Sequence, residues 1–142
     1  MTPESATALP LLLVVDDCAD LREGCALACR SAGYPTIEAD TGHEALRQAV
    51  RHRPQLVILD LKLPGVAGWD VATLLKLDPR TRDIRILVMS GSIDSLDASC
   101  TRHAEAVLRK PFGTADLLAC VNQLVSNGAA AAVDGRDDAS AD

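Results

Sequence analysis

Residues 55–68 read QLVILDLKLPGVAG, and this stretch decides the fold class. It opens with a continuous apolar run that ends in an acid, Asp60, and it continues into a loop rich in glycine and proline. A short apolar run without alternation is typical of a strand buried on both faces, as in parallel sheets covered by helices. The stretch therefore predicts a central parallel strand with a carboxylate at its carboxyl end.

The rest of the chain alternates between segments of strand character and segments of helical character. Four more segments carry the strand pattern: residues 11–17, 35–40, 84–90 and 106–112. Five segments carry helical periodicity, of which the fourth is weak: residues 18–33, 42–53, 69–77, 94–103 and 114–128. Such alternation predicts an α/β fold with a doubly wound, five-stranded parallel sheet and helices on both faces.

Length and composition fit one small domain. The chain has 142 residues, of which 48% are hydrophobic, enough to form a core. We expect a flexible leader at residues 1–10, a folded domain at 11–126 and a disordered tail at 127–142.

Charge and cysteine content limit the cellular compartments and the kinds of partner that we expect for the protein. The net charge of −6 disfavours non-specific binding to nucleic acid or to a membrane surface. The five cysteines form no C-x-x-C pair, and neither a secretory signal nor a membrane span is visible. We therefore expect a soluble cytoplasmic protein with no nucleic-acid and no membrane partner.

Reactive side chains stand at the ends of four predicted strands: Asp16 and Asp17, Asp60, Ser90, and Lys110. A parallel sheet brings these ends to one edge, where ligands of such folds bind. Three neighbouring carboxylates repel one another, and a hard cation such as Mg²⁺ relieves that repulsion. An anion held by a cation, a lysine and a hydroxyl is most simply a phosphoryl group, for which Asp60 is the best acceptor.

These residues resemble the CheY-like receiver domain of response regulators from two-component signalling systems. The resemblance covers residues 10–126 and includes Pro64 and Gly68 after Asp60, Ser90 thirty residues after Asp60, and the run Lys110-Pro111-Phe112. It implies a flavodoxin-like (βα)5 sheet of strand order 2-1-3-4-5. It also implies a structural cis bond before Pro111.

The resemblance assigns a metal site and a phosphoacceptor. Asp60 would accept the phosphoryl group, with Mg²⁺ or Mn²⁺ as the cofactor. The metal ligands would be Asp17, Asp60 and the backbone carbonyl of Lys62, with Asp16 acting through a water molecule.

The resemblance also implies roles around the phosphoryl group, and the sequence departs from the family there. Ser90 would be the switch hydroxyl, Lys110 would pair with a phosphoryl oxygen, and Lys62 and Ser92 would tune hydrolysis. Val107 stands where the family usually has an aromatic residue, which makes the switch position atypical. Only nineteen residues separate Ser90 from Lys110, so we expect a short or irregular fourth helix, an atypical output face and no conventional dimerisation.

The function that follows is a stand-alone phosphorylation switch or relay rather than a turnover enzyme. A histidine kinase or histidine phosphotransfer protein would supply the phosphoryl group, and output would pass through an unknown protein target or onward transfer. Leu27 lies off the apolar side of the helix at 18–33, which contains Leu21 and Cys25, and is a candidate for docking the donor.

Two other classes of protein remain as alternatives. One is a Mg²⁺-dependent phosphatase of the haloacid-dehalogenase type, which typically has a second Asp two residues after its nucleophile, where this chain has Lys62. The other is a flavodoxin-like binding module for a nucleotide or flavin. The 2% aromatic content and the lack of a glycine-rich phosphate loop speak against that module.

Overall fold

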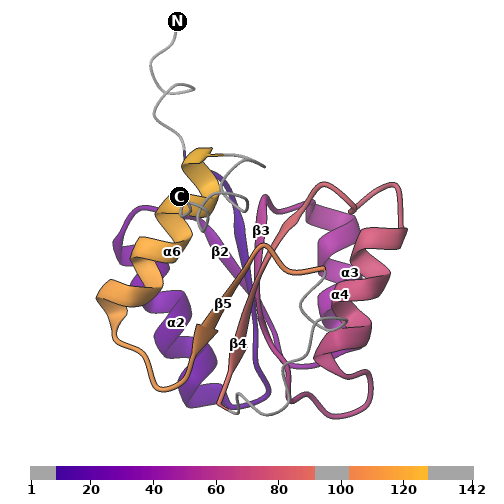
Figure 1. The fold of residues 1–142 in the computed structure, drawn as a ribbon, viewed down its shortest axis with the longest axis horizontal. Coiled ribbons are helices and arrows are strands. Elements are labelled where there is room, and N and C mark those ends of the chain that lie inside the picture. Colours follow the sequence, from indigo (N-terminus) through magenta and orange to yellow (C-terminus); the bar gives the residue numbers. More distant parts are fainter. Residues whose placement is uncertain (1–8, 92–102, 128–142) are drawn as a thin grey trace, which may run out of the picture.

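The computed structural model describes residues 9–91 and 103–127, which form alternating strands and helices (Figure 1). The strands are β1 (Leu12–Val15), β2 (Thr36–Ala39), β3 (Leu56–Asp60), β4 (Arg85–Ser90) and β5 (Ala106–Arg109). The helices are α2 (Ala19–Ser31), α3 (Gly42–His52), α4 (Gly68–Leu77) and α6 (Thr114–Asn127). The predicted helix at 94–103 lies outside the described residues except at its last position, and so do most of the predicted leader and tail.

All five strands are parallel, in the order β2-β1-β3-β4-β5, so the predicted topology is confirmed. The register aligns Val15 with Leu59, which places Asp16 and Asp60 at the same level of neighbouring strands. Asp60 in turn lies beside Met89, one residue before Ser90. The carboxyl ends of the three central strands therefore meet at one edge of the sheet.

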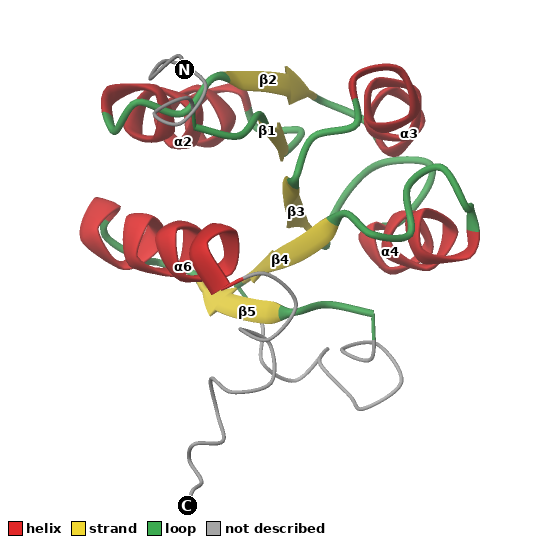
Figure 2. Cartoon of the chain, turned by 90° about the horizontal axis from the view of Figure 1, so that it is seen from above, coloured by secondary structure: helices red, strands yellow, loops and turns green. Residues whose placement is uncertain are grey.

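Helices cover both faces of the sheet, as the view from above shows: α2 and α6 lie on one side, and α3 and α4 lie on the other (Figure 2). Strand β1 serves both layers, because Leu12 and Val14 pack in the core under α2 and α6 while Leu13 and Val15 pack in the core under α3 and α4. All four side chains are fully buried, and each contributes roughly 1.5–3 kcal/mol. Two-sided burial explains why β1 is apolar at every position, and why β3 is apolar until its last residue, Asp60.

Local chemistry fixes the ends of the helices on either side of β2. The N-cap of α3 is Thr41, whose Oγ1 accepts a hydrogen bond of 3.0 Å from the Glu44 backbone N–H. After α2 the chain turns at Gly33, which has a φ of 101° that residues with a side chain rarely adopt.

The helices in the part of the chain that the structure describes are too short or too polar to span a membrane.

An ion pair ties α4 to the start of β5. Lys76 Nζ lies 2.9 Å from Glu105 Oε2 and donates to the Ile84 carbonyl at 2.7 Å. The other carboxylate oxygen of Glu105 accepts the Ile86 N–H at 2.7 Å. Both charged side chains are largely buried. The pair thus joins α4, β4 and the residue that precedes β5.

Candidate functional site

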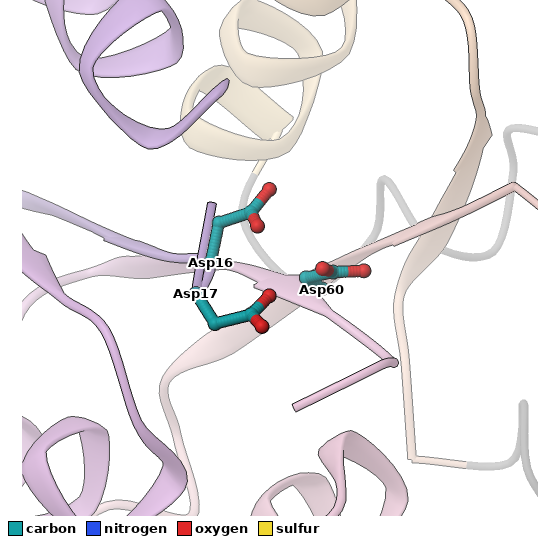
Figure 3. A group of neighbouring side chains, drawn as sticks. All are labelled: Asp16, Asp17 and Asp60. Carbon is teal, nitrogen blue, oxygen red and sulfur yellow. The ribbon is translucent and has the colours of Figure 1, made fainter. Parts of the chain in front are cut away.

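Three carboxylates gather at the carboxyl edge of the sheet (Figure 3). Oxygens of Asp16, Asp17 and Asp60 all lie within 4.8 Å of one another. Asp16 is 1% exposed and Asp60 5% exposed, while Asp17 is open to solvent. In Figure 3 the carboxylate of Asp17 points toward Asp60. The cluster is therefore closed on the protein side and accessible on the Asp17 side.

The fifth strand brings a lysine to the cluster. Lys110 Nζ lies 3.4 Å from Asp60 Oδ1 and 3.5 Å from Asp16 Oδ2. The backbone N–H of Lys110 donates to the Ser90 carbonyl at 2.8 Å, which fixes the lysine at the end of β4. The peptide bond between Lys110 and Pro111 is cis, as predicted. Residues from four predicted strand ends thus meet, although they are far apart in sequence.

Backbone donors hold the two buried carboxylates in place. The Cys18 N–H donates to Asp16 Oδ1 at 3.0 Å, and the Lys62 N–H is 3.3 Å from Asp60 Oδ1.

Gly68 allows α4 to start against the end of β3, because a Cβ there would lie 2.6 Å from the Asp60 carbonyl oxygen and from Leu61 Cα. The glycine eight residues after Asp60 thus has a steric reason that the sequence alone does not show.

The electrostatics of Asp60 are those of a crowded, buried acid. Burial, and then the charge of Asp16, raise the pKa of Asp60, while the Lys110 ammonium and the Lys62 N–H act in the opposite direction. The negative charge of the cluster exceeds what Lys110 supplies. The carboxylates are hard oxygen donors, so a divalent cation such as Mg²⁺ fits the set.

The remaining predicted site residues take different places. Ser90 is 4% exposed and ends β4 at the same edge, next to the lysine. The side chain of Lys62 is exposed, and Val107 is 37% exposed on β5. Ser92, predicted to tune hydrolysis, lies outside the described residues. The structure therefore brings Ser90 to the cluster, leaves the side chains of Lys62 and Val107 on the surface, and does not test Ser92.

A cavity of about 520 Å³ adjoins the cluster, between α2 and the β5–α6 connection. Asp16 and Lys110 line it on one side, and apolar side chains that include Leu21 and Phe112 line the rest. Sequence periodicity places Leu21 on the same side of α2 as Cys25 and Ala28, and all three line this cavity, where Leu21 is 49% exposed. The apolar side of α2 is therefore as predicted, and at Leu21 it faces the cavity.

A family model described as the response regulator receiver domain matches residues 12–122. The chain belongs to this family. The receiver domain is the signal-receiving part of two-component systems, and the match spans every described strand and most of α6. Family membership and the CheY-like doubly wound fold were both predicted from the sequence, and both are confirmed.

Curated relatives of this receiver domain include transcriptional regulators. The phosphate regulon regulator PhoB of Pseudomonas aeruginosa is 36% identical over 110 residues, covering 76% of this chain and 48% of PhoB. PrrA of Mycobacterium tuberculosis is 32% identical over 122 residues, covering 86% of this chain and 52% of PrrA. The chain spans about half the length of the curated relatives it matches. Its predicted stand-alone action and lack of a nucleic-acid partner stay predictions.

Solved structures share the fold. A protein of Chloroflexus aurantiacus described as a response regulator is 30% identical, with a TM-score of 0.78, and the match covers 84% of this chain and 99% of that one. The receiver domain of the sensor histidine kinase PA1611 from Pseudomonas aeruginosa is 22% identical, with a TM-score of 0.75 and coverage of 84% and 100%. That structure has a magnesium ion in its active-site cleft. At 22% identity the likeness supports the fold alone.

Proposed function

We propose that Asp60 of this receiver domain accepts a phosphoryl group in a reaction that depends on a divalent cation. One observation carries the proposal: three carboxylates lie within 4.8 Å of one another, and the Lys110 ammonium is 3.4 Å from Asp60. Such a cluster is costly without a cation, because like charges in a buried site repel. The same cluster with a cation is suited to the negative oxygens of a phosphoryl group.

The donors present fit Mg²⁺ or Mn²⁺. Asp17 and Asp60 would bind the metal directly, the Lys62 carbonyl would be the third protein ligand, and Asp16 would act through a water molecule. Each of these is an oxygen donor, which is the type of ligand that Mg²⁺ prefers. When bound, the cation supplies charge neutralisation for the carboxylates and for the phosphoryl oxygens.

The transfer step uses residues of this chain as follows. A phosphohistidine of the donor loses its N–P bond while one carboxylate oxygen of Asp60 forms the new O–P bond, and the departing imidazole takes up a proton from solvent. The Lys110 ammonium lies where it can neutralise a phosphoryl oxygen, and the buried Ser90 hydroxyl at the same edge can donate to another. Hydrolysis of the aspartyl-phosphate, which Lys62 and Ser92 would tune, returns Asp60 to its free state.

The donor would be a histidine kinase or a histidine phosphotransfer protein. The cavity beside Asp16 and Lys110, with the exposed Leu21 at its edge, leaves the acidic cluster approachable from the α2 side. Output would be a protein–protein contact or onward transfer of the phosphoryl group. Val107 lacks the ring that the family usually moves with the switch hydroxyl, so we expect an atypical output face.

Intact-protein mass spectrometry after incubation with acetyl phosphate tests the proposal. We expect a single phosphoryl adduct on the wild type with Mg²⁺, and none with EDTA or in the Asp60→Asn variant. Asp83→Asn, which changes an exposed carboxylate beyond the acidic cluster, should label like the wild type. An adduct that persists in Asp60→Asn would assign the acceptor to another residue.

A further inference from the structure

We propose that Arg22, at the end of the first turn of α2, is a positioning residue for the acidic cluster. In this role Arg22 fixes the backbone between Asp16 and Asp17 and so directs Asp17 toward the cation. The inference rests on the proposed function, because it concerns the same cation site. It assigns a role to a residue that touches neither the cation nor the phosphoryl group.

The contacts of Arg22 converge on the carboxyl end of β1. Its Nη1 donates to the Asp16 carbonyl oxygen at 3.1 Å, and its Nε donates to Glu38 Oε1 at 3.0 Å. The Arg22 side chain is 16% exposed, so these are largely buried, charge-assisted hydrogen bonds. Glu38 belongs to β2 and fixes the direction of the guanidinium. A planar guanidinium held by two hydrogen bonds has little freedom to rotate away from the Asp16 carbonyl.

The Asp16 carbonyl matters because it belongs to the peptide unit that leads into Asp17. That unit is planar, so holding its oxygen fixes the orientation of the whole plane and the starting direction of Asp17. The neighbouring groups are already engaged: the Asp16 N–H donates to the Ala39 carbonyl at 3.2 Å, and the Cys18 N–H donates to Asp16 Oδ1. Arg22 completes this set of restraints. Asp17 itself is exposed, and its orientation therefore depends on the backbone behind it.

Arg30 provides a matched comparison on the same helix. It also pairs with Glu38, at 3.1 Å, but its second contact is the Thr36 carbonyl at 2.7 Å. Thr36 is the first residue of β2 and lies beside Leu12, at the opposite end of the strand pair from Asp16. The two arginines thus share an acidic partner and a helix, and they differ in which backbone carbonyl they hold.

The test is an NMR titration of the full chain with Mg²⁺, following the backbone amides of residues 16–18 and 60–62. We expect Arg22→Met to weaken Mg²⁺ binding about tenfold, the lower end of the effect of outer partners of metal sites. Arg30→Met should bind Mg²⁺ like the wild type. Arg22→Lys keeps one charged donor without the fork, and it should give an intermediate affinity.

Each other outcome overturns the inference. Unchanged Mg²⁺ affinity in Arg22→Met would show that the Asp16 contact does not position the site. An equal loss in Arg22→Met and Arg30→Met would assign the effect to the packing of α2 on β2. If Arg22→Met fails to fold, wild-type affinity in Arg22→Lys overturns the inference instead. A wild type whose amides do not respond to Mg²⁺ would overturn the proposed cation site and the inference together.

Discussion

Replacing Asp60 by Asn should stabilise the receiver domain when no cation is present. Burial and the charge of Asp16 raise the pKa of Asp60, so the folded state holds the ionised form less well than the unfolded chain does. Below the unfolded pKa of 3.8, the Asp60 carboxyl is protonated in both states and does not reduce the free energy of unfolding. As the pH rises through the folded pKa, the buried carboxyl must ionise, and that part of the free energy of unfolding is lost. At neutral pH the wild type therefore lacks stability that an uncharged asparagine would keep.

The size of the effect follows from opposing contributions. With an effective dielectric constant of about 20, Asp16 and Asp60, whose oxygens lie within 4.8 Å of each other, repel by at least roughly 3.5 kcal/mol, and Lys110 at 3.4 Å attracts Asp60 by roughly 5 kcal/mol. These contributions nearly cancel. Desolvation of the carboxylate, which costs several kcal/mol, then decides the sign. After allowing for burial of the amide, we expect a gain of about 1–3 kcal/mol, or about 3–10 °C in Tm.

Urea denaturation in EDTA, followed by the fluorescence of the single tryptophan Trp69, measures the difference. The gap between Asp60→Asn and the wild type should be largest at pH 8 and should narrow as the pH falls through the folded pKa of Asp60. Asp83→Asn removes an exposed charge and should stay within about 0.5 kcal/mol of the wild type. An Asp60→Asn variant that is less stable than the wild type at pH 8 in EDTA would refute the reasoning.

Two further predictions concern packing and docking. Gly68→Ala should lower the free energy of unfolding by about 3 kcal/mol in the same urea assay, because its Cβ would meet backbone atoms at 2.6 Å. Gly24 lies in the interior of α2, and a Cβ added there would have no neighbour within 4 Å. Gly24→Ala should therefore raise the free energy of unfolding by about 0.5–1 kcal/mol. Equal stabilities for the two variants would contradict the steric account. Leu27, 65% exposed on α2, is a predicted contact of the donor, and Leu27→Asp should slow phosphotransfer from the cognate kinase about tenfold. Labelling by acetyl phosphate should not change, and an unaltered rate of transfer from the kinase would remove Leu27 from the docking surface.

The sequence predicts the sheet and most of the site for one physical reason. Strands buried on both faces are apolar along their length, so residues 11–15 and 56–59 stand out and their ends are marked by Asp16 and Asp60. Parallel strands place those ends together, which is why residues as distant as Asp16 and Lys110 could be assigned to one site. The observed distances among the carboxylates and the lysine agree with that expectation.

Other features depend on tertiary geometry that periodicity does not encode. Leu21 matches the apolar side of its helix, but only the fold shows that this side faces a cavity at Leu21 and leaves it 49% exposed. Nothing in the sequence distinguishes Arg22 from an ordinary surface charge. Only the fold shows that it donates to the Asp16 carbonyl at the end of β1 and to Glu38. The reason for Gly68 likewise requires knowing where α4 starts relative to β3.

The ion pair of Lys76 and Glu105 has a consequence for the alignment of the edge strand. Successive residues of β5 face opposite sides, so a slip of one residue against β4 would exchange the faces of Val107 and Leu108. The same slip would carry Lys110 out of step with Asp60. Because Glu105 is joined both to α4 and to the Ile86 N–H, the register of β5 is fixed just before the strand begins. An ion pair at the opposite end of β5 from the acidic cluster thus helps to set the position of Lys110 relative to Asp60.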